Sequence, residues 1–469
     1  MTTNTNQAPA LDVVSPFDGT LIETIPQSTA EDAERMLETA SALNKNRDGW
    51  LAHHERTAIL KKLAERVEAE AESFAMLIAK EGGKPLMDAR VEVARAVDGI
   101  QLAIKELSHI MRGEEIPMGH TKAADGRIAF STYEPIGVVL AVSAFNHPLN
   151  LIVHQVVPAI AVGCPVIVKP ASSTPLNCLR FVELVHQSGL PEAWCQVCVC
   201  NSAVAEKLVT DARINFFSFI GSAKVGWTLR SKLAPGVRCA LEHGGVAPVI
   251  VDEQADLEKA IPSLLKGGFY HAGQVCVSVQ RVYAHQSIAR ELAQRLAAAA
   301  DKLVVGDATR EDTEVGPLIK PGEVDRVEQW VEEAVAQGAE LVTGGKRLGD
   351  TTYAPTVLFN PPNDAKVSTV EVFGPVVCVY SYRDRQQAIE LANGLDVAFQ
   401  AAVFTRDINT AMDTVKRLDA TAVMVNDHTA FRVDWMPFAG RRASGYGIGG
   451  IGYTMHDMVQ IKMAVIKTD

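Results

Sequence analysis

Short apolar runs alternate with longer amphipathic stretches along most of the chain. Over residues 31–111 the apolar positions recur with helical spacing, and Gly82, Gly83 and Pro85 mark a stop and a restart. This part of the sequence therefore predicts several amphipathic helices that pack side by side.

Five apolar runs between residues 136 and 243 alternate with helical patterns. The runs are IGVVLAV, PVIVK, CQVCVC, NFFSFIG and CALEH. Strands that are apolar at nearly every position are typical of a parallel sheet with both faces covered by helices. We therefore expect an α/β fold.

A second series of the same kind begins with VAPVIVD at residue 246. It contains a long helical stretch that ends at Gly273, helices over 286–300 and 323–338, and the strand-like runs QRVYAH, YAPTVL, VVCVYSY, QAAVFT and TAVMVN. No internal repeat or low-complexity linker separates the two series. We therefore expect a second α/β domain that packs closely against the first, with a cleft between them.

Two segments depart from the alternating pattern. Residues 113–132 lack a strong helical period and end in an extended run, which favours a protruding hairpin that pairs with another element. Residues 151–168 are mostly apolar and reach the lower length limit of a membrane-spanning helix, but His154, Pro158 and Pro165 interrupt them. We expect a buried helix followed by a strand there, and no membrane association.

The composition is that of an ordinary globular protein. Of the 469 residues, 47% are hydrophobic and 22% are charged. The 45 Lys and Arg against 56 Asp and Glu give a net charge of -11 without a block of like charges, which argues against a nucleic-acid partner. The N-terminal residues lack the features of an export signal, so we expect a cytoplasmic protein.

The eight cysteines are scattered through the chain, so free thiols are expected. Cys195 and Cys198 form a C-x-x-C motif. However, Cys198 and Cys200 follow the spacing of a buried strand, and no thioredoxin-like unit surrounds them. A redox role is therefore not favoured, and no metal site is expected.

Two glycine-rich stretches are candidates for a nucleotide-binding turn. Gly447, Gly449 and Gly452 fit G-x-G-x-x-G, but no strand precedes them and too few residues follow for the helix and second strand of a dinucleotide fold. Gly221 and Ser222 directly follow the run NFFSFI and open a helical pattern, so they can hold a pyrophosphate at a helix N-terminus. Alone, this signal is weak, because such turns are common.

Three residues supply the groups needed for covalent chemistry at a carbonyl carbon. Cys276, in HAGQVCVSVQR, offers a thiol nucleophile. Glu242, in LEHGG, offers a carboxylate base, and Asn146, in AFNHPLN, offers an amide donor. The alternative is that Cys276 is a buried structural cysteine, which is the default for any single cysteine.

Seven motifs carry a resemblance to the aldehyde dehydrogenase superfamily over essentially the whole chain. They are SAFNHP, VIVKPASSTP, FIGSAKVG, LEHGG, GQVC, EVFGPV and PFAGRRASGYG, in the family's order and spacing. The resemblance implies a Rossmann-like coenzyme domain, an α/β catalytic domain and a small β element for oligomerisation. It places these at residues 1–112 with 133–245, at 246–440, and at 113–132 with 455–469.

The resemblance also implies roles for the motif residues. Cys276 is the nucleophile that adds to the aldehyde, Glu242 activates water against the resulting thioester, and Asn146 with the backbone N–H of Cys276 binds the oxyanion. A homodimer or homotetramer is implied as well, and the alternating apolar residues of the run MVQIKMAVIKTD suit a sheet edge that pairs across subunits. The residues expected to hold the coenzyme are Lys169, Ser172, Gly221, Ser222, Glu371 and Phe373.

Three departures from the family pattern concern this chain in particular. LELGG is LEHGG here, so His243 stands beside the base, either as a hydrogen-bonded neighbour or as a group that shifts the carboxylate pKa. The PFGG-type run is PFAG, with Ala439 in place of a glycine. Ser172 stands where NAD-preferring relatives often carry a glutamate, which predicts that NADP is used at least as well as NAD.

The expected substrate is a small polar or anionic aldehyde. His147, Asn150 and His154 are spaced i, i+3 and i+7 in the helix predicted after AFN, so they are expected to share one polar face toward the substrate. Arg432 can hold an anionic group of the substrate, unless it is a surface residue paired with Asp434. The resemblance includes enzymes that act on lactaldehyde, glyceraldehyde or succinate semialdehyde.

Two other function classes stay open at this point. A coenzyme A-acylating relative would pass the acyl group to a thiol, but such enzymes typically lack the glutamate matched by Glu242. A non-catalytic protein on the same fold is the other alternative.

Overall fold

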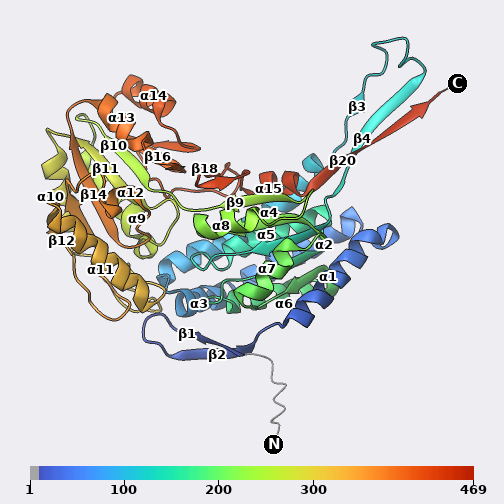
Figure 1. Cartoon of the computed structure of the whole chain (residues 1–469), viewed down its shortest axis with the longest axis horizontal. Coiled ribbons are helices and arrows are strands. Elements are labelled where there is room, and N and C mark those ends of the chain that lie inside the picture. Colours follow the sequence, from blue (N-terminus) through green and yellow to red (C-terminus); the bar gives the residue numbers. More distant parts are fainter. Residues whose placement is uncertain (1–9, 469) are drawn as a thin grey trace, which may run out of the picture.

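The computed structural model describes residues 10–468 and contains two large sheets (Figure 1). The first sheet has the strand order β19-β9-β8-β5-β6-β7, and its neighbouring strands are parallel except β19 with β9. The predicted α/β fold class is confirmed, since five of these strands fall on the five apolar runs. Their bounds are β5 Val138–Val142, β6 Val166–Lys169, β7 Cys195–Val197, β8 Ile214–Ile220, β9 Arg238–Glu242 and β19 Gly445–Tyr446.

Helices cover both faces of this sheet. Successive residues of a strand point to opposite faces, so alternate residues pack against different helices. Val139 and Ala141 of β5 pack with helices α2 to α6, whereas Val138 and Leu140 pack with α1 and α7. The bounds are α1 Ala30–Lys45, η1 Arg47–Gly49, α2 His53–Ala69, α3 Ala71–Gly82, α4 Leu86–Ile110, α5 Asn150–Val162, α6 Leu176–Gln187, η2 Glu192–Trp194, α7 Ser202–Thr210, α8 Ala223–Arg230 and α15 Ile451–Asp457.

The breaks in the helical region follow the sequence signals. Gly83 ends α3 with a φ of 69°, a left-handed conformation that glycine adopts without strain, and Pro85 directly precedes α4. Every residue of α5 is buried, and β6 follows it, so the apolar stretch 151–168 is a buried helix and a strand, as predicted. Within residues 10–468, no helix has both the length and the apolar content to cross a membrane.

The second sheet has the order β12-β13-β14-β11-β10-β16-β17, with only β12 antiparallel to its neighbour. Its interior is a second buried cluster, filled mainly by valine, alanine and leucine from the strands and from α9 to α11. The bounds are β10 Ala247–Val251, α9 Leu257–Phe269, η3 Tyr270–Gly273, β11 Val279–His285, α10 Ala289–Ala300, α11 Pro321–Ala336, β12 Glu340–Thr343, β13 Thr356–Phe359, α12 Lys366–Thr369, β14 Val376–Tyr382, α13 Arg385–Asn393, β16 Gln400–Phe404, α14 Ile408–Arg417 and β17 Ala422–Val425.

Several predicted bounds shift for local reasons. The helix expected over 323–338 begins at Pro321, because proline suits the first helical turn, where its missing N–H is not needed. The helix expected over 286–300 begins only at Ala289. The strand expected over CQVCVC ends at Val197, so Cys198 and Cys200 do not alternate on a strand; both are buried after it.

Three smaller sheets complete the fold of the described residues. β3 Glu115–Ile116, β4 Arg127–Pro135 and β20 Val459–Lys467 form an antiparallel arm that stands out from the body of the molecule (Figure 1). β20 pairs with β4 along its whole length, and β3 pairs with β4 at Phe130 and Ala129, so the predicted hairpin over 113–132 extends to residue 135. The other two are β1 Ala10–Val14 with β2 Leu21–Pro26, and β15 Val397–Ala398 with β18 Arg441–Arg442.

Two predictions remain, one on an export signal at the N-terminus and one on the state of the cysteines. Residues 1–9, which carry most of the segment tested for an export signal, lie outside the described residues, as does Asp469. All eight cysteines lie within the described part, where each is a free thiol.

Candidate active site

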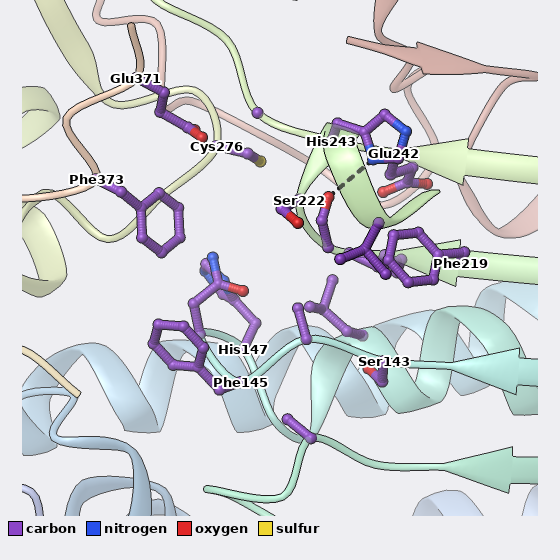
Figure 2. A pocket seen from close by; sticks show the side chains of 18 of the residues that line it. Ser143, Phe145, His147, Phe219, Ser222, Glu242, His243, Cys276, Glu371 and Phe373 are labelled. Atoms are coloured by element: carbon purple, nitrogen blue, oxygen red, sulfur yellow. Dashed lines mark hydrogen bonds between the residues drawn. The ribbon is translucent and has the colours of Figure 1, made fainter. Parts of the chain in front are cut away.

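A cavity of about 540 Å³ lies where the two sheets face each other, at the carboxyl ends of β5, β8 and β9. This is the edge at which open parallel sheets generally bind ligands. Figure 2 shows the side chains of Cys276, Glu242, Glu371 and Phe373 around one cavity. The sequence predictions for these residues and for Asn146 therefore converge on one place.

Cys276 lies on a turn between η3 and β11 that the protein holds firmly. Its backbone C=O accepts a hydrogen bond from Gly245 N–H at 3.2 Å. The neighbouring Gln274 is buried, and its side chain accepts from Ile319 N–H at 3.0 Å. Burial, and secondarily the charge of Glu371, raise the pKa of the Cys276 thiol to about 12. The thiol is therefore protonated at neutral pH until another group takes its proton.

Glu242 ends β9 at the cavity wall. A Cβ at Gly449 would lie 2.0 Å from Oε1 of Glu242, so a glycine there is what makes room for the carboxylate. Burial raises the pKa of Glu242, and the nearby charge of Arg432 opposes the shift. A carboxylate with a raised pKa in a cavity is suited to accepting a proton.

Asn146 follows β5 and is buried. Its Nδ2 donates to the backbone C=O of Gln274 at 2.9 Å, which fixes the amide two residues from Cys276. An amide nitrogen carries two N–H groups, so one remains for a ligand.

Glu371 and Phe373 reach the cavity from the loop before β14. The Glu371 carboxylate lies so close to Gly244 that a Cβ there would come within 1.9 Å of Oε1. That oxygen is buried and has no hydrogen-bond partner, and burial raises the pKa of Glu371 to about 8. Phe373 has a φ of 45° and meets Phe145 edge to face at 5.9 Å. An unpartnered carboxylate oxygen suits a ligand with hydroxyl donors, such as the ribose of a nucleotide.

Of the residues expected to hold the adenosine and pyrophosphate, some line the cavity and others do not. Gly221 and Ser222 line the cavity at the start of α8, and Ser222 makes no side-chain capping bond. Lys169 ends β6, where its Nζ donates to the backbone C=O of Pro170 at 3.0 Å, and burial lowers its pKa. Ser172 is exposed and lies outside the lining of the cavity.

Of the predicted polar face, Asn150 and His154 lie on one side of α5, whereas His147 precedes the helix, which begins at Asn150. Only His147 lines the cavity, and its Nε2 lies 3.2 Å from the Tyr270 hydroxyl. Asn150 and His154 are buried and turn toward Asp434 instead. Sequence spacing predicts which residues share a face of a helix, but it does not predict which residues of other elements that face contacts.

Arg432 is near the reacting groups and is not paired with Asp434. Its charge lowers the pKa of both Glu242 and Cys276. Its Nη2 lies 3.4 Å from Nδ1 of His154, while its buried Nε has no hydrogen-bond partner. The Asp434 carboxylate is already held by Arg95 at 2.7 Å and by Nε2 of His154 at 2.7 Å.

The geometry of this chain agrees with a comparison to known families. The profile described as the aldehyde dehydrogenase family matches residues 2–464. The chain belongs to the aldehyde dehydrogenase family. The predicted family and enzyme class are confirmed: it is an NAD(P)-dependent oxidoreductase that oxidises an aldehyde to the acid.

Three proteins illustrate what this aldehyde dehydrogenase resembles in sequence and in structure. The 3-sulfolactaldehyde dehydrogenase of Priestia aryabhattai is 38% identical over 94% of this chain and 92% of its own. Aldehyde dehydrogenase 21 of Physcomitrella patens, solved with its reaction product succinate, has a TM-score of 0.94 and 35% identity over 98% of this chain and 96% of its own. A glyceraldehyde-3-phosphate dehydrogenase of Methanocaldococcus jannaschii, solved with NADP, has a TM-score of 0.92 and 34% identity over 99% and 100%.

The structure of this aldehyde dehydrogenase adds residues that the sequence did not indicate. Glu323, Arg326 and Trp330 of α11 line the cavity opposite the first sheet. Nε of Arg326 donates to Glu323 at 2.8 Å, and its guanidinium stacks on Trp330 at 4.8 Å. Their spacing is that of any amphipathic helix, so no sequence signal marked them. Within residues 10–468, no group of three or more His, Cys, Asp or Glu side chains is placed to hold a metal ion.

Proposed function

We propose that this enzyme oxidises a small aldehyde that carries an anionic group, with Arg432 binding that group. The observation that carries the proposal is the Arg432 guanidinium, which lies near Cys276 and Glu242 with a buried N–H that has no partner. A buried donor of this kind is unfavourable unless a ligand satisfies it. Asn150 and His154 belong to the proposed substrate site through Arg432 and Asp434, and His147 through the cavity wall.

The three relatives support an anionic substrate. The names of two relatives specify a sulfonated and a phosphorylated aldehyde, and the third was solved with a dicarboxylate product. Arginine binds sulfonate, phosphate and carboxylate through the same fork of N–H donors.

We propose the following roles for the chain's own residues. The Cys276 thiol first loses its proton to solvent water, and the sulfur then adds as thiolate to the carbonyl carbon of the aldehyde. The oxyanion that forms accepts hydrogen bonds from the free N–H of Asn146 and from the backbone N–H of Cys276. Bound NAD or NADP would accept the hydride that leaves the former aldehyde carbon. Loss of this hydride converts the adduct on Cys276 into a thioester. Glu242 then takes a proton from the water that attacks the Cys276 thioester, which releases the acid and restores the thiol. Its raised pKa suits this role.

We propose that the coenzyme spans the cavity from the end of β6 to Glu371. Lys169 and Ser172 would meet the adenosine ribose, Gly221 and Ser222 the pyrophosphate, and Glu371 with Phe373 the nicotinamide half; these are the six positions given by the family motifs. The unpartnered Oε1 of Glu371 fits a hydroxyl donor of the coenzyme. We propose further that NADP is used at least as well as NAD, because Ser172 brings no carboxylate to the 2′ position.

The test of this function is a panel of aldehydes assayed for reduced-coenzyme formation with NAD and with NADP. It pairs each anionic aldehyde with a neutral one of similar size, for example succinate semialdehyde with butyraldehyde. We expect kcat/KM to be at least about tenfold higher for the anionic member, as one charge-assisted hydrogen bond predicts. Equal values across the pairs would contradict the anionic substrate class, and no coenzyme reduction with any aldehyde would contradict the catalytic roles.

We propose a homodimer or homotetramer assembled through the arm of β3, β4 and β20. Large apolar side chains are exposed along this arm, which supports an interface there. They are Ile128 54%, Phe130 42%, Ile461 64%, Met463 56%, Val465 48% and Ile466 51% exposed.

We also propose boundaries for the functional domains of the chain. Residues 1–112 and 133–245 would form the coenzyme domain, 246–440 the catalytic domain, and 113–132 with 455–469 the oligomerisation element. The two separate large sheets and the arm support this division. The free thiols support a cytoplasmic location.

A further inference from the structure

His243 is the residue at which this chain departs from the LELGG motif, and it is 2% exposed. It directly follows Glu242 at the end of β9 and lines the cavity beside Gly221 and Ser222. Its backbone N–H donates to the C=O of Ser444 at 3.0 Å, so its position on the strand end is fixed.

The imidazole of His243 holds the turn that opens α8. Its Nδ1 lies 2.8 Å from the backbone C=O of Gly221, and Figure 2 marks this bond. A carbonyl only accepts hydrogen bonds, so Nδ1 carries the proton and donates. The backbone N–H of Gly221 in turn donates to the C=O of Glu242 at 3.0 Å. Both backbone groups of Gly221 are therefore held by two consecutive residues of the strand end that carries the base.

The ring is also enclosed on its other sides. Its centroid lies 5.8 Å from those of Phe219 and Trp227, both near edge to face. A Cβ at Gly226 would lie 2.0 Å from Cε1 of His243, so only glycine at that position leaves room for the ring against α8. The imidazole thus fills the space between β8, β9 and the first turn of α8.

Packing alone does not account for a histidine at this position. Nε2 of His243 is buried without a hydrogen-bond partner, and an apolar side chain of similar size would avoid that penalty. Burial lowers the pKa of His243, so the ring is neutral and keeps the single Nδ1–H that Gly221 requires. The hydrogen bond to Gly221 is what the imidazole adds beyond filling space.

We propose that His243 is a positioning residue for the coenzyme, because its Nδ1–H holds the Gly221–Ser222 turn in the geometry that receives the pyrophosphate. The inference rests on the proposed coenzyme site. It predicts that a leucine at 243, as in the LELGG motif, fills the space but releases the turn. The expected effect is on coenzyme binding rather than on the chemistry at Cys276.

The test compares His243→Leu with His243→Asn, whose side-chain amide can place an N–H near the position of Nδ1. Titration calorimetry measures the Kd for NADPH, and initial rates give KM and kcat for NADP. Loss of one net hydrogen bond predicts that His243→Leu raises Kd and KM by about three- to tenfold. At saturating NADP, kcat should stay within about twofold, and His243→Asn should restore Kd to within about twofold of the wild type.

Gly226→Ala is a second variant that leaves the histidine in place. Its Cβ would push the ring away from Gly221, so it should raise the Kd for NADPH in the same direction, and it keeps the test open if His243→Leu does not fold. Thermal unfolding monitors the fold of each variant.

Three results would overturn the inference: an unchanged Kd in His243→Leu, equal losses in the leucine and asparagine variants, or a loss of kcat with Kd unchanged. A wild-type enzyme that binds neither NADPH nor NADH would instead contradict the proposed function.

Discussion

Arg432→Met removes the guanidinium that we propose binds the substrate anion, while keeping a side chain of similar length. Asp434 retains Arg95 and His154, so the substitution does not leave that carboxylate without a partner. The substitution removes the N–H donors that the ligand would bind. These are the buried Nε–H and the N–H groups of the Nη atoms. We expect the variant to lose its preference for anionic aldehydes.

The size of this effect follows from the kind of contact. A hydrogen bond to a charged group contributes about 1.5–3 kcal/mol, which corresponds to roughly a 10- to 150-fold loss in kcat/KM for the anionic aldehyde. A neutral aldehyde of equal length loses only the indirect effect of Arg432 on the reacting groups. The ratio of the two kcat/KM values therefore isolates binding of the anion.

The indirect effect of Arg432 has a definite sign. The positive charge lowers the pKa of both Cys276 and Glu242, so its removal raises both. Because the reaction needs the thiolate, the rise of activity with pH should move to higher pH in Arg432→Met for both substrates. The measurement is kcat/KM for succinate semialdehyde and butyraldehyde across pH in the wild type, Arg432→Lys and Arg432→Met. Lysine keeps the charge but not the fork, so it should restore the pH profile more than the selectivity.

A selectivity ratio that Arg432→Met leaves unchanged would refute this reasoning. In that case equal losses for both aldehydes would mean that Arg432 acts on the thiol and the base alone. The anion would then have to bind a residue other than Arg432.

Four further outcomes are expected. Cys276→Ala should abolish aldehyde oxidation and any ester hydrolysis, and a tenth of the wild-type turnover would disprove its role. Glu242→Gln should leave a stoichiometric burst of reduced coenzyme followed by slow turnover in rapid-mixing absorbance, whereas loss of the burst would mean that the glutamate acts before the thioester forms. Ser172→Glu should raise the NAD/NADP ratio of kcat/KM by about tenfold or more, and an unmoved ratio would show that residue 172 does not read the 2′ position. Sedimentation at micromolar concentration should give a dimer or tetramer, and a 50.6 kDa monomer would contradict assembly through the arm.

Most strands of the two large sheets were predictable because their residues are buried on both faces, whereas the edge strands β12 and β19 were not predicted. β5 and β8 are short and apolar at nearly every position, which is typical of strands inside a covered parallel sheet. The β1–β2 hairpin escaped prediction, because Asp12 and Glu23 interrupt its short apolar pattern and most of its residues are exposed. Local pattern also could not identify β4 as the partner of β20, since that pairing joins residues 330 positions apart.

The site divides in a similar way. Motif residues such as Glu371 were found through family resemblance, since EVFGPV without it reads as an ordinary turn. The contact of His154 with Asp434, 280 positions later, could not be predicted, because a helical repeat shows which residues share a face but not which residues that face contacts. Arg326 gave no signal, because its relation to the cavity depends on how α11 of one sheet approaches the other.

The pairing of β4 with β20 also constrains the order in which the chain folds during synthesis. β4 is made early, yet its long partner strand is made only after both large sheets have been translated. Contacts so distant in sequence form slowly, and until β20 arrives the edge of β4 presents unpaired backbone N–H and C=O groups beside Ile128 and Phe130. A nascent or truncated chain without β20 therefore exposes an unpaired strand edge with apolar side chains beside it, which favours aggregation at this stage.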